Sequence, residues 1–177
     1  MQMQNAYRAA QYLWRRQRWY RKQVRRQVAV NSFTGNREGV NSVGGMTLSM
    51  FETVFAGTNA RVASQFHRCV TDDEYGDHLM MYISPSKSES GDESNGTHYS
   101  ALGDVATPKK AVALVSHLDS IYPAEVEAVH GHTWQPYSDH SGYIRGPGTM
   151  DIKCGTANIA MTLEALSIID PEVRLQI

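Results

Sequence analysis

Residues 111–119 read Ala-Val-Ala-Leu-Val-Ser-His-Leu-Asp, a short apolar run that ends in a histidine and an aspartate two positions apart. An apolar run of this length, with Pro108 before it and polar residues after it, is typical of a buried strand in a sheet covered on both faces. At the end of such a strand, His117 and Asp119 project to the same side. A carboxylate beside an imidazole fixes its tautomer and orientation, so we interpret His117 as a metal ligand and Asp119 as the group that orients it.

A second informative stretch, residues 146–155, reads Gly-Pro-Gly-Thr-Met-Asp-Ile-Lys-Cys-Gly and leads into an apolar segment that ends at residue 169. The spacing of the apolar residues predicts a helix over 155–169. Its predicted buried face consists of Ile159, Leu163 and Leu166. Asp151 is therefore expected in a glycine-rich loop just before a helix N-terminus. The two oxygens of its carboxylate are enough to bridge two cations.

The rest of the chain alternates between helical and strand-like patterns. Residues 6–28 and 44–55 are predicted helices, and residues 61–70 and 79–83 are predicted strands whose partners the sequence leaves open. Residues 84–97 are rich in Ser, Gly and Asn, which predicts a polar surface loop. This alternation indicates an α/β fold.

Taken together, these motifs resemble the M20 family of zinc-dependent peptidases and deacylases. The family has a strand that ends in His-x-Asp, as at 117–119, then an aromatic-rich stretch, as at 133–137. Next comes Gly-x-Gly-x-x-Asp-x-Lys-Gly-Gly at the start of a helix, as at 146–155. Residues 30–40, Val-Asn-Ser-Phe-Thr-Gly-Asn-Arg-Glu-Gly-Val, are similar to the family's early Ser-x-Thr-Gly-x-x-x-Gly segment. The Gly-Pro-Gly form looks most like the glutamate carboxypeptidase branch, and the resemblance covers roughly residues 28–177.

The resemblance implies a three-layer, zinc-exopeptidase-like catalytic domain with a mixed, largely parallel sheet between helices, here truncated. It also implies two zinc ions: His117 would ligate one, Asp151 would bridge both, and Asp119 would hold His117. Other divalent cations such as cobalt are compatible with these ligands. Zinc polarises a carbonyl and lowers the pKa of bound water to about 7. The implied reaction is hydrolysis of an amide bond in a small peptide or an N-acyl amino acid. The enzyme would be a carboxypeptidase-like exopeptidase or a deacylase. The complete protein would be compatible with a homodimer.

Several parts of the family's site have no counterpart in this sequence. They are a Glu-Glu pair that supplies the general base and a ligand, a later acidic ligand, a distal histidine and an inserted lid domain. Residues 173–177, Val-Arg-Leu-Gln-Ile, stand where the strand before the Glu-Glu pair would begin. Stable zinc sites normally have four ligands, or three and a water. We therefore expect this chain alone to be inactive and to bind zinc weakly.

These considerations divide the chain into a basic N-terminal helix, residues 1–29, and the N-terminal portion of a catalytic domain, residues 30–177. An alternative interpretation is a non-catalytic remnant or binding protein that uses the basic helix to engage an acidic partner.

Two finer expectations concern the second motif. Cys154 replaces the family's glycine and is interpreted as a small buried thiol, and the resemblance implies a cis peptide bond between Asp151 and Ile152.

Other polar residues near the motifs have more ordinary interpretations. His130, His132 and His140 lie in a Gly-, Pro- and Tyr-rich segment, where surface positions are favoured over substrate contact or metal binding. Lys153 is expected to pair with a group of its own loop rather than to act in catalysis. Glu164 lies nearly three turns beyond the motif, so we predict a solvated helix face for it.

The composition limits the classes of protein to which this chain can belong. A chain of 177 residues, 41% hydrophobic and 20% charged, is long enough for one domain with a core. No apolar run approaches the roughly 20 residues of a membrane span, and no secretory signal pattern is visible. The two cysteines, Cys69 and Cys154, form no CxxC motif, which favours a reducing compartment. We therefore predict a cytoplasmic protein without a membrane span.

The small net charge of -1 conceals an asymmetry. Residues 1–30 carry eight of the 17 basic residues and none of the 18 acidic ones, so this segment has a charge of +8 and the rest has −9. Three interpretations compete: a helix that packs on the catalytic sheet with a solvated arginine face, a docking helix for an acidic partner, or a transit peptide. We favour the first, and nucleic acid is not the partner we expect.

Overall fold

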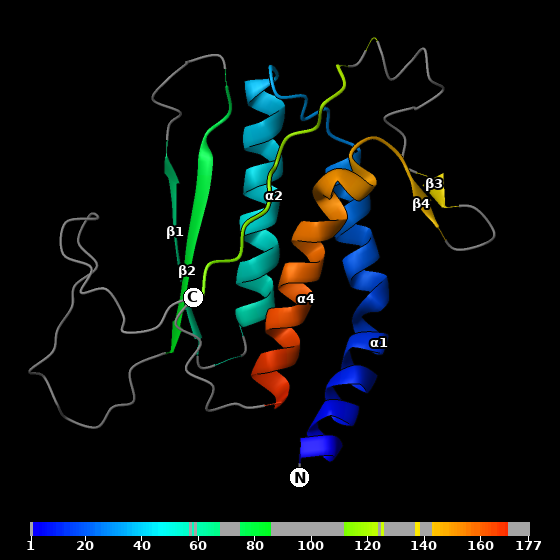
Figure 1. The fold of residues 1–177 in the computed structure, drawn as a ribbon, viewed down its shortest axis with the longest axis vertical. Coiled ribbons are helices and arrows are strands. Elements are labelled where there is room, and N and C mark those ends of the chain that lie inside the picture. Colours follow the sequence, from blue (N-terminus) through cyan, green and yellow to red (C-terminus); the bar gives the residue numbers. More distant parts are fainter. Residues whose placement is uncertain are drawn as a thin grey trace, which may run out of the picture.

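The computed structural model describes residues 2–56, 58, 60–67, 75–85, 112–123, 125, 137–138 and 143–169. Three long helices lie side by side, and an antiparallel strand pair lies against one of them (Figure 1). The helices are α1 (Gln2–Val28), α2 (Arg37–Phe55) and α4 (Cys154–Ile169), and the strands are β1 (Ala60–His67) and β2 (His78–Pro85). A short hairpin follows, made of β3 (Tyr137–Ser138) and β4 (Ile144–Arg145). The three predicted helices are thus confirmed.

Helix α1 forms because its 27 residues contain no glycine or proline and are rich in Ala, Arg and Gln, which are good helix formers. Its buried residues include Ala9, Tyr20, Val24 and Val28. Within the described residues α1 packs mainly on α4 and also contacts α2, and the three helices share one core. Packing of α1 on the catalytic sheet stays a prediction, because the described residues do not include the expected central sheet.

Helix α2 begins at Arg37, seven residues before the predicted start. Asn36 caps it, because its side-chain oxygen accepts a hydrogen bond from the Gly39 backbone N–H at 3.1 Å. A Cβ atom at Gly39 would lie 1.8 Å from the carbonyl oxygen of Asn31, so only glycine fits there. Met50 and Phe51 are buried in the shared core, where each contributes about 1.5–3 kcal/mol.

Strands β1 and β2 pair with each other in an antiparallel ladder that runs from Ala60 opposite Pro85 to His67 opposite His78. This confirms the two predicted strands over their described residues and supplies the partners that the sequence left open. Helix α2 contacts both strands on one face. The expected central sheet with largely parallel strands stays a prediction, because the ladders within the described ranges are antiparallel apart from one isolated bridge between Phe33 and Ser120.

The segment 112–118 is the clearest departure from expectation. The sequence predicts a buried strand at 111–115, but residues 112–115 are extended chain without strand pairing and are exposed, Val112 by 60% and Val115 by 86%. A strand is defined by hydrogen bonds to a neighbouring strand, and the described part of the chain places no strand beside this segment. The prediction of a paired, buried strand is therefore wrong for these residues.

Helix α4 is buried on a face different from the predicted one. Leu163 is buried as expected, whereas Ile159 and Leu166 are half-buried. The other buried residues are Thr156, Ala157, Ala160 and Glu164. Both α1 and α2 pack on α4, and most of the residues of α4 that are buried are small.

By length and composition the stretch Thr149–Ile169 could cross a membrane, a test that core helices of soluble proteins also pass.

Some predictions fall outside the described residues. These are the loop at 86–97, His130, His132 and His140, and the strand start at 173–177.

Candidate metal centre

The end of the extended segment is held in place by short-range contacts. The Ser120 N–H donates to the Ser32 carbonyl at 2.7 Å, and the Thr34 N–H donates to the Ser120 carbonyl at 3.1 Å. The hydroxyl groups of Ser116 and Thr156 lie 3.0 Å apart, which ties the segment to α4. These contacts flank His117 and Asp119 on both sides, so the backbone that carries them is fixed even though residues 112–115 are exposed.

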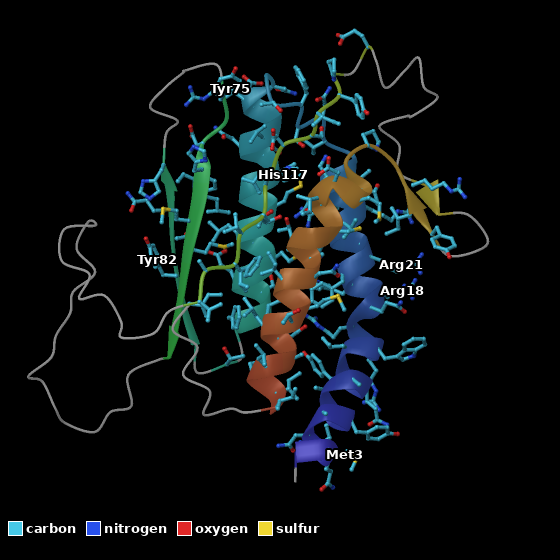
Figure 2. The ribbon with its side chains drawn as sticks, viewed as in Figure 1. Met3, Arg18, Arg21, Tyr75, Tyr82 and His117 are labelled. Carbon is cyan, nitrogen blue, oxygen red and sulfur yellow. The ribbon has the colours of Figure 1, made fainter. Side chains whose placement is uncertain are left out.

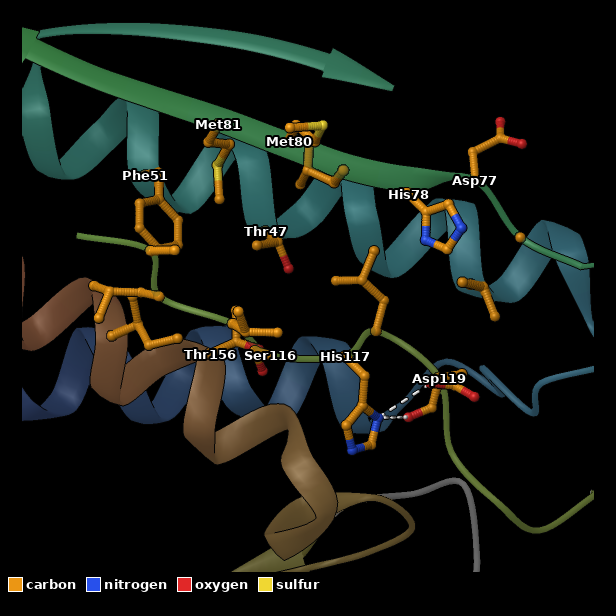
Figure 3. Close-up of a pocket in the computed structure, with 18 of the residues that line it drawn as sticks. Thr47, Phe51, Asp77, His78, Met80, Met81, Ser116, His117, Asp119 and Thr156 are labelled. Atoms are coloured by element: carbon orange, nitrogen blue, oxygen red, sulfur yellow. Dashed lines mark hydrogen bonds and ion pairs between the residues drawn. The ribbon is translucent and has the colours of Figure 1, made fainter. Parts of the chain in front are cut away.

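Asp119 contacts two groups through its two oxygens. His117 Nδ1 lies 3.1 Å from Asp119 Oδ1 and 3.1 Å from the Asp119 backbone carbonyl (Figure 3). The Thr34 hydroxyl donates to Asp119 Oδ2 at 2.5 Å. A carboxylate held in this way orients the imidazole through Nδ1 and leaves Nε2 pointing away. The contact expected between His117 and Asp119 is present.

Asp151 lies in a tight turn at the start of α4. The turn η2 (Thr149–Lys153) follows Gly148, whose φ of 67° lies in the left-handed region that glycine adopts at no steric cost. Asp151 has non-helical backbone angles, φ −117° and ψ 86°, and its peptide bond to Ile152 is cis, as the resemblance implies. The side chain is exposed and faces the end of the extended segment.

Lys153 holds this turn in place through a buried contact. Its side chain is buried, with 1% of the residue exposed, and its Nζ donates to the Val30 carbonyl at 3.0 Å. The contact joins the turn to the chain that follows α1. Through this contact Lys153 supports the position of Asp151 from inside the structure.

His117 and Asp151 come together although 34 residues separate them. His117 Nε2 lies 3.0 Å from Asp151 Oδ1, so the imidazole stands between two carboxylates. A neutral imidazole has one N–H and can donate to only one of them, and the other contact would set a nitrogen lone pair against a carboxylate oxygen. The arrangement is balanced when Nδ1–H donates to Asp119 and a proton or a metal cation lies between Nε2 and Asp151.

The residues present fit a zinc ion in part. Two ligands that each lie about 2.0–2.2 Å from a tetrahedral zinc are roughly 3.3–3.6 Å apart, close to the 3.0 Å between Nε2 and Oδ1. Imidazole and carboxylate are both ordinary zinc ligands. Among the described residues no cluster of three or more His, Cys, Asp or Glu side chains is arranged to hold a metal. His117 and Asp151 are thus two candidate ligands, fewer than a tight zinc site requires.

Glu164 is a correction to the sequence prediction, because it is buried rather than solvated. Its carboxylate accepts hydrogen bonds from Tyr20 at 2.6 Å and Tyr12 at 3.1 Å and pairs with Arg16 at 3.2 Å. The Arg16 guanidinium also lies 4.2 Å from the centre of the Trp19 ring. Burial, followed by the bond to Glu164, raises the pKa of Tyr20, and burial also raises that of Tyr12. This cluster joins α1 to α4 and lies away from the metal centre.

Cys154 is half-buried, and burial raises the pKa of its thiol. A thiol in this state is a poor nucleophile, which agrees with the structural role predicted for it.

Two contributors to these sites were not identified from sequence. Thr34 belongs to a quoted motif, but its bond to Asp119 requires a contact across 85 residues. The side chains that donate hydrogen bonds to Glu164 lie on another helix, α1. The only sequence signal for its burial was an acidic residue in a largely apolar segment.

The sequence matches no protein-family model and no curated protein.

Proposed function

We propose that this chain carries part of the metal centre of a zinc-dependent hydrolase that cleaves amide bonds, the activity implied by its resemblance to the M20 family. The observation that carries the proposal is the 3.0 Å approach of His117 Nε2 to Asp151 Oδ1, with Asp119 on the other imidazole nitrogen. The substrate class would be a small peptide or an N-acyl amino acid.

The roles of the side chains follow from this geometry. His117 and Asp151 would bind the metal, Asp119 would keep Nε2 of His117 directed at it, and Thr34 would hold Asp119. Bound zinc would polarise a carbonyl and lower the pKa of water to about 7. Because His117 and Asp151 are only two candidate ligands, we expect weak zinc binding and no hydrolysis by this chain alone.

Metal binding by the purified chain tests the proposal. Competition with a chromophoric chelator should detect one weak site for Zn²⁺ and Co²⁺, and His117→Ala and Asp151→Ala should each abolish it. His78→Ala is the matched control, because His78 is an exposed histidine at the start of β2 and should leave binding unchanged. Binding that survives both site variants would overturn the assignment.

A second candidate function is supported by the outer surface of α1. Six basic residues of this helix are exposed, and α1 contains no acid to balance them. They are Arg8, Arg15, Arg18, Lys22, Arg25 and Arg26. Figure 2 shows Arg18 on the side of α1 that faces away from α4, and Trp14 is 76% exposed. Such a face suits an acidic partner.

Heparin chromatography tests this second function. We expect salt-dependent retention that falls when Arg15, Arg18 and Lys22 are all changed to Gln, because the positive face loses three charges. Retention that stays the same in this variant would remove the docking interpretation. Since none of the three residues contacts the metal centre, zinc binding should be unaffected, which separates the two functions.

A further inference from the structure

The outer side of α1 carries a stripe of apolar side chains that the rest of the molecule does not cover. Its members are spaced by three or four residues, which places them within about 60° of arc on one side of the helix. They are Met3, Tyr7, Ala10 and Trp14, and all four are exposed. Met3 is 86% exposed and Trp14 is 76% exposed. Single exposed apolar residues need no explanation, whereas a continuous row of them indicates a surface that binds a partner.

A row of basic side chains runs beside this apolar stripe. Helical spacing places its members on the adjoining 80° or so of the helix surface. They are Arg8, Arg15, Arg18 and Lys22, and all four are exposed. Arg18 points away from α4 (Figure 2), and α1 contains no Asp or Glu that could balance this charge. The acid that pairs with this helix, Glu164, does so through Arg16 on the side that faces α4.

The two rows meet at a shallow hollow of about 320 Å³. Ala10 and Trp14 line the hollow on the apolar side, and Gln11 and Arg15 line it on the basic side. An aromatic ring next to a guanidinium matches the two parts of a phospholipid near the surface of a bilayer. Tryptophan is enriched at the level of the headgroups, and arginine binds phosphate oxygens.

The arrangement favours one class of partner over the others. A second copy of the chain would bring the +8 of its own residues 1–30 against the first, and like charges repel. A polyanion held by charge alone would leave the apolar stripe in water. A bilayer with anionic lipids contacts both rows, because its phosphates attract the basic groups while its acyl boundary buries apolar side chains. The long stems of Arg and Lys let their charged ends reach the phosphates.

We propose that this side of α1 binds the surface of a bilayer that contains anionic lipids, with the helix parallel to the membrane plane. The inference rests on the second function proposed above, docking of α1 to an acidic partner, and names that partner. Met3, Tyr7 and Trp14 enter the boundary between headgroups and acyl chains, and the basic row binds the phosphates. The buried side of α1 keeps its contacts with α4, so binding requires no unfolding.

Cosedimentation of the purified chain with vesicles tests the proposal. We expect binding to phosphatidylcholine vesicles that contain about 30% phosphatidylserine, little binding to phosphatidylcholine alone, and release by salt. Changing Arg15, Arg18 and Lys22 together to Gln should lower the partition coefficient about 100-fold, because each basic residue near an anionic surface contributes about fivefold. Equal binding to both kinds of vesicle, or binding to neither, would overturn the proposal.

Trp14→Ala separates lipid binding from attraction to any polyanion. Burial of about 60 Å² of the ring at the acyl boundary corresponds to about tenfold in the partition coefficient, which this variant should lose. Its retention on heparin should stay the same, because no charge is removed. Tyr75→Ala changes an exposed aromatic residue outside α1 and is the matched control, which should bind vesicles as the unchanged chain does. All these variants alter exposed side chains, so circular dichroism should show the same helical content.

The remaining outcomes identify a different partner. Retention on heparin without vesicle binding would overturn the lipid inference while docking to an acidic protein or nucleic acid stands. Loss of both would remove the docking function as well. A dimer in sedimentation that Trp14→Ala dissociates, without vesicle binding, would assign the apolar stripe to a second copy.

Discussion

Two carboxylate clusters in this molecule differ in burial and in charge balance. Glu164 is 3% exposed and is matched by three donors, two tyrosine hydroxyls and the Arg16 guanidinium. At the candidate metal centre Asp119 and Asp151 face the His117 imidazole, and the Asp151 side chain is 63% exposed. The Glu164 carboxylate has its donors in place, whereas the two aspartates beside His117 are balanced only by an added proton or cation. Charge balance therefore separates a structural cluster from a candidate binding site.

Removing the carboxylate of the buried cluster should have the largest effect. In Glu164→Ala, Arg16 and both tyrosines lose their acceptor between α1 and α4. We expect the free energy of unfolding in urea to fall by about 3 kcal/mol, the lower end for a broken buried pair, because the Arg16 side chain is 25% exposed. Glu52→Ala, at an exposed position of α2, is the control and should change stability by less than about 0.5 kcal/mol. Similar values for the two variants would show that the cluster does not hold the helices together.

Removing the Asp119 carboxylate, which orients His117, should change the affinity for metal more than the free energy of unfolding. Asp119→Ala frees the His117 ring to rotate, and loss of such a partner typically lowers metal affinity by about 10–100-fold. Zinc titration of this variant should show that decrease, with the free energy of unfolding changed by less than about 1 kcal/mol. Asp77→Ala is a suitable control, because Asp77 pairs with Arg37 away from the site. An equal loss of affinity in both variants would argue against a positioning role for Asp119.

Alkaline pH should weaken the buried cluster gradually. The pKa of Tyr20 is raised above its ordinary value of 10.0, first by burial and then by Glu164. Above pH 10 the unfolded chain releases this proton while the folded chain retains it, so the free energy of unfolding falls as pH rises. For Tyr20 the slope steepens through pH 10 toward a limit of about 1.4 kcal/mol per pH unit. Urea unfolding between pH 9 and 11 should show this steepening, and Tyr20→Phe should reduce it. An unchanged slope in the variant would remove Tyr20 as its source.

Some features were predictable because their causes are local. The helices at 6–28 and 155–169 follow from composition and apolar spacing, and the capping of α2 depends on Asn36 within one turn. The approach of His117 to Asp119 follows from their separation of two residues in extended chain. Even so, the sequence placed the start of α2 too late, because its first turn contains Gly39 and little apolar periodicity.

Other features depend on distant partners and were predicted wrongly or not at all. The burial of Glu164 requires Tyr20 from another helix, and the bond from Thr34 to Asp119 joins segments 85 residues apart. The strand predicted at 111–115 needs a neighbour that the described residues do not provide. In each case the environment of the residues was set by contacts that no local pattern records.

The amino-acid sequence was enough to predict three helices, the gathering of basic charge in the first of them, and a histidine and aspartates of the types that bind metals. Those properties belong to single residues and to their near neighbours along the chain. Only the tertiary structure decided that His117 Nε2 faces Asp151 across 3.0 Å and that the side of α1 with Trp14 stays exposed. Both depend on how α4 packs against α1 and α2, since that packing covers another side of α1 and sets where the turn before α4 meets the end of the extended segment.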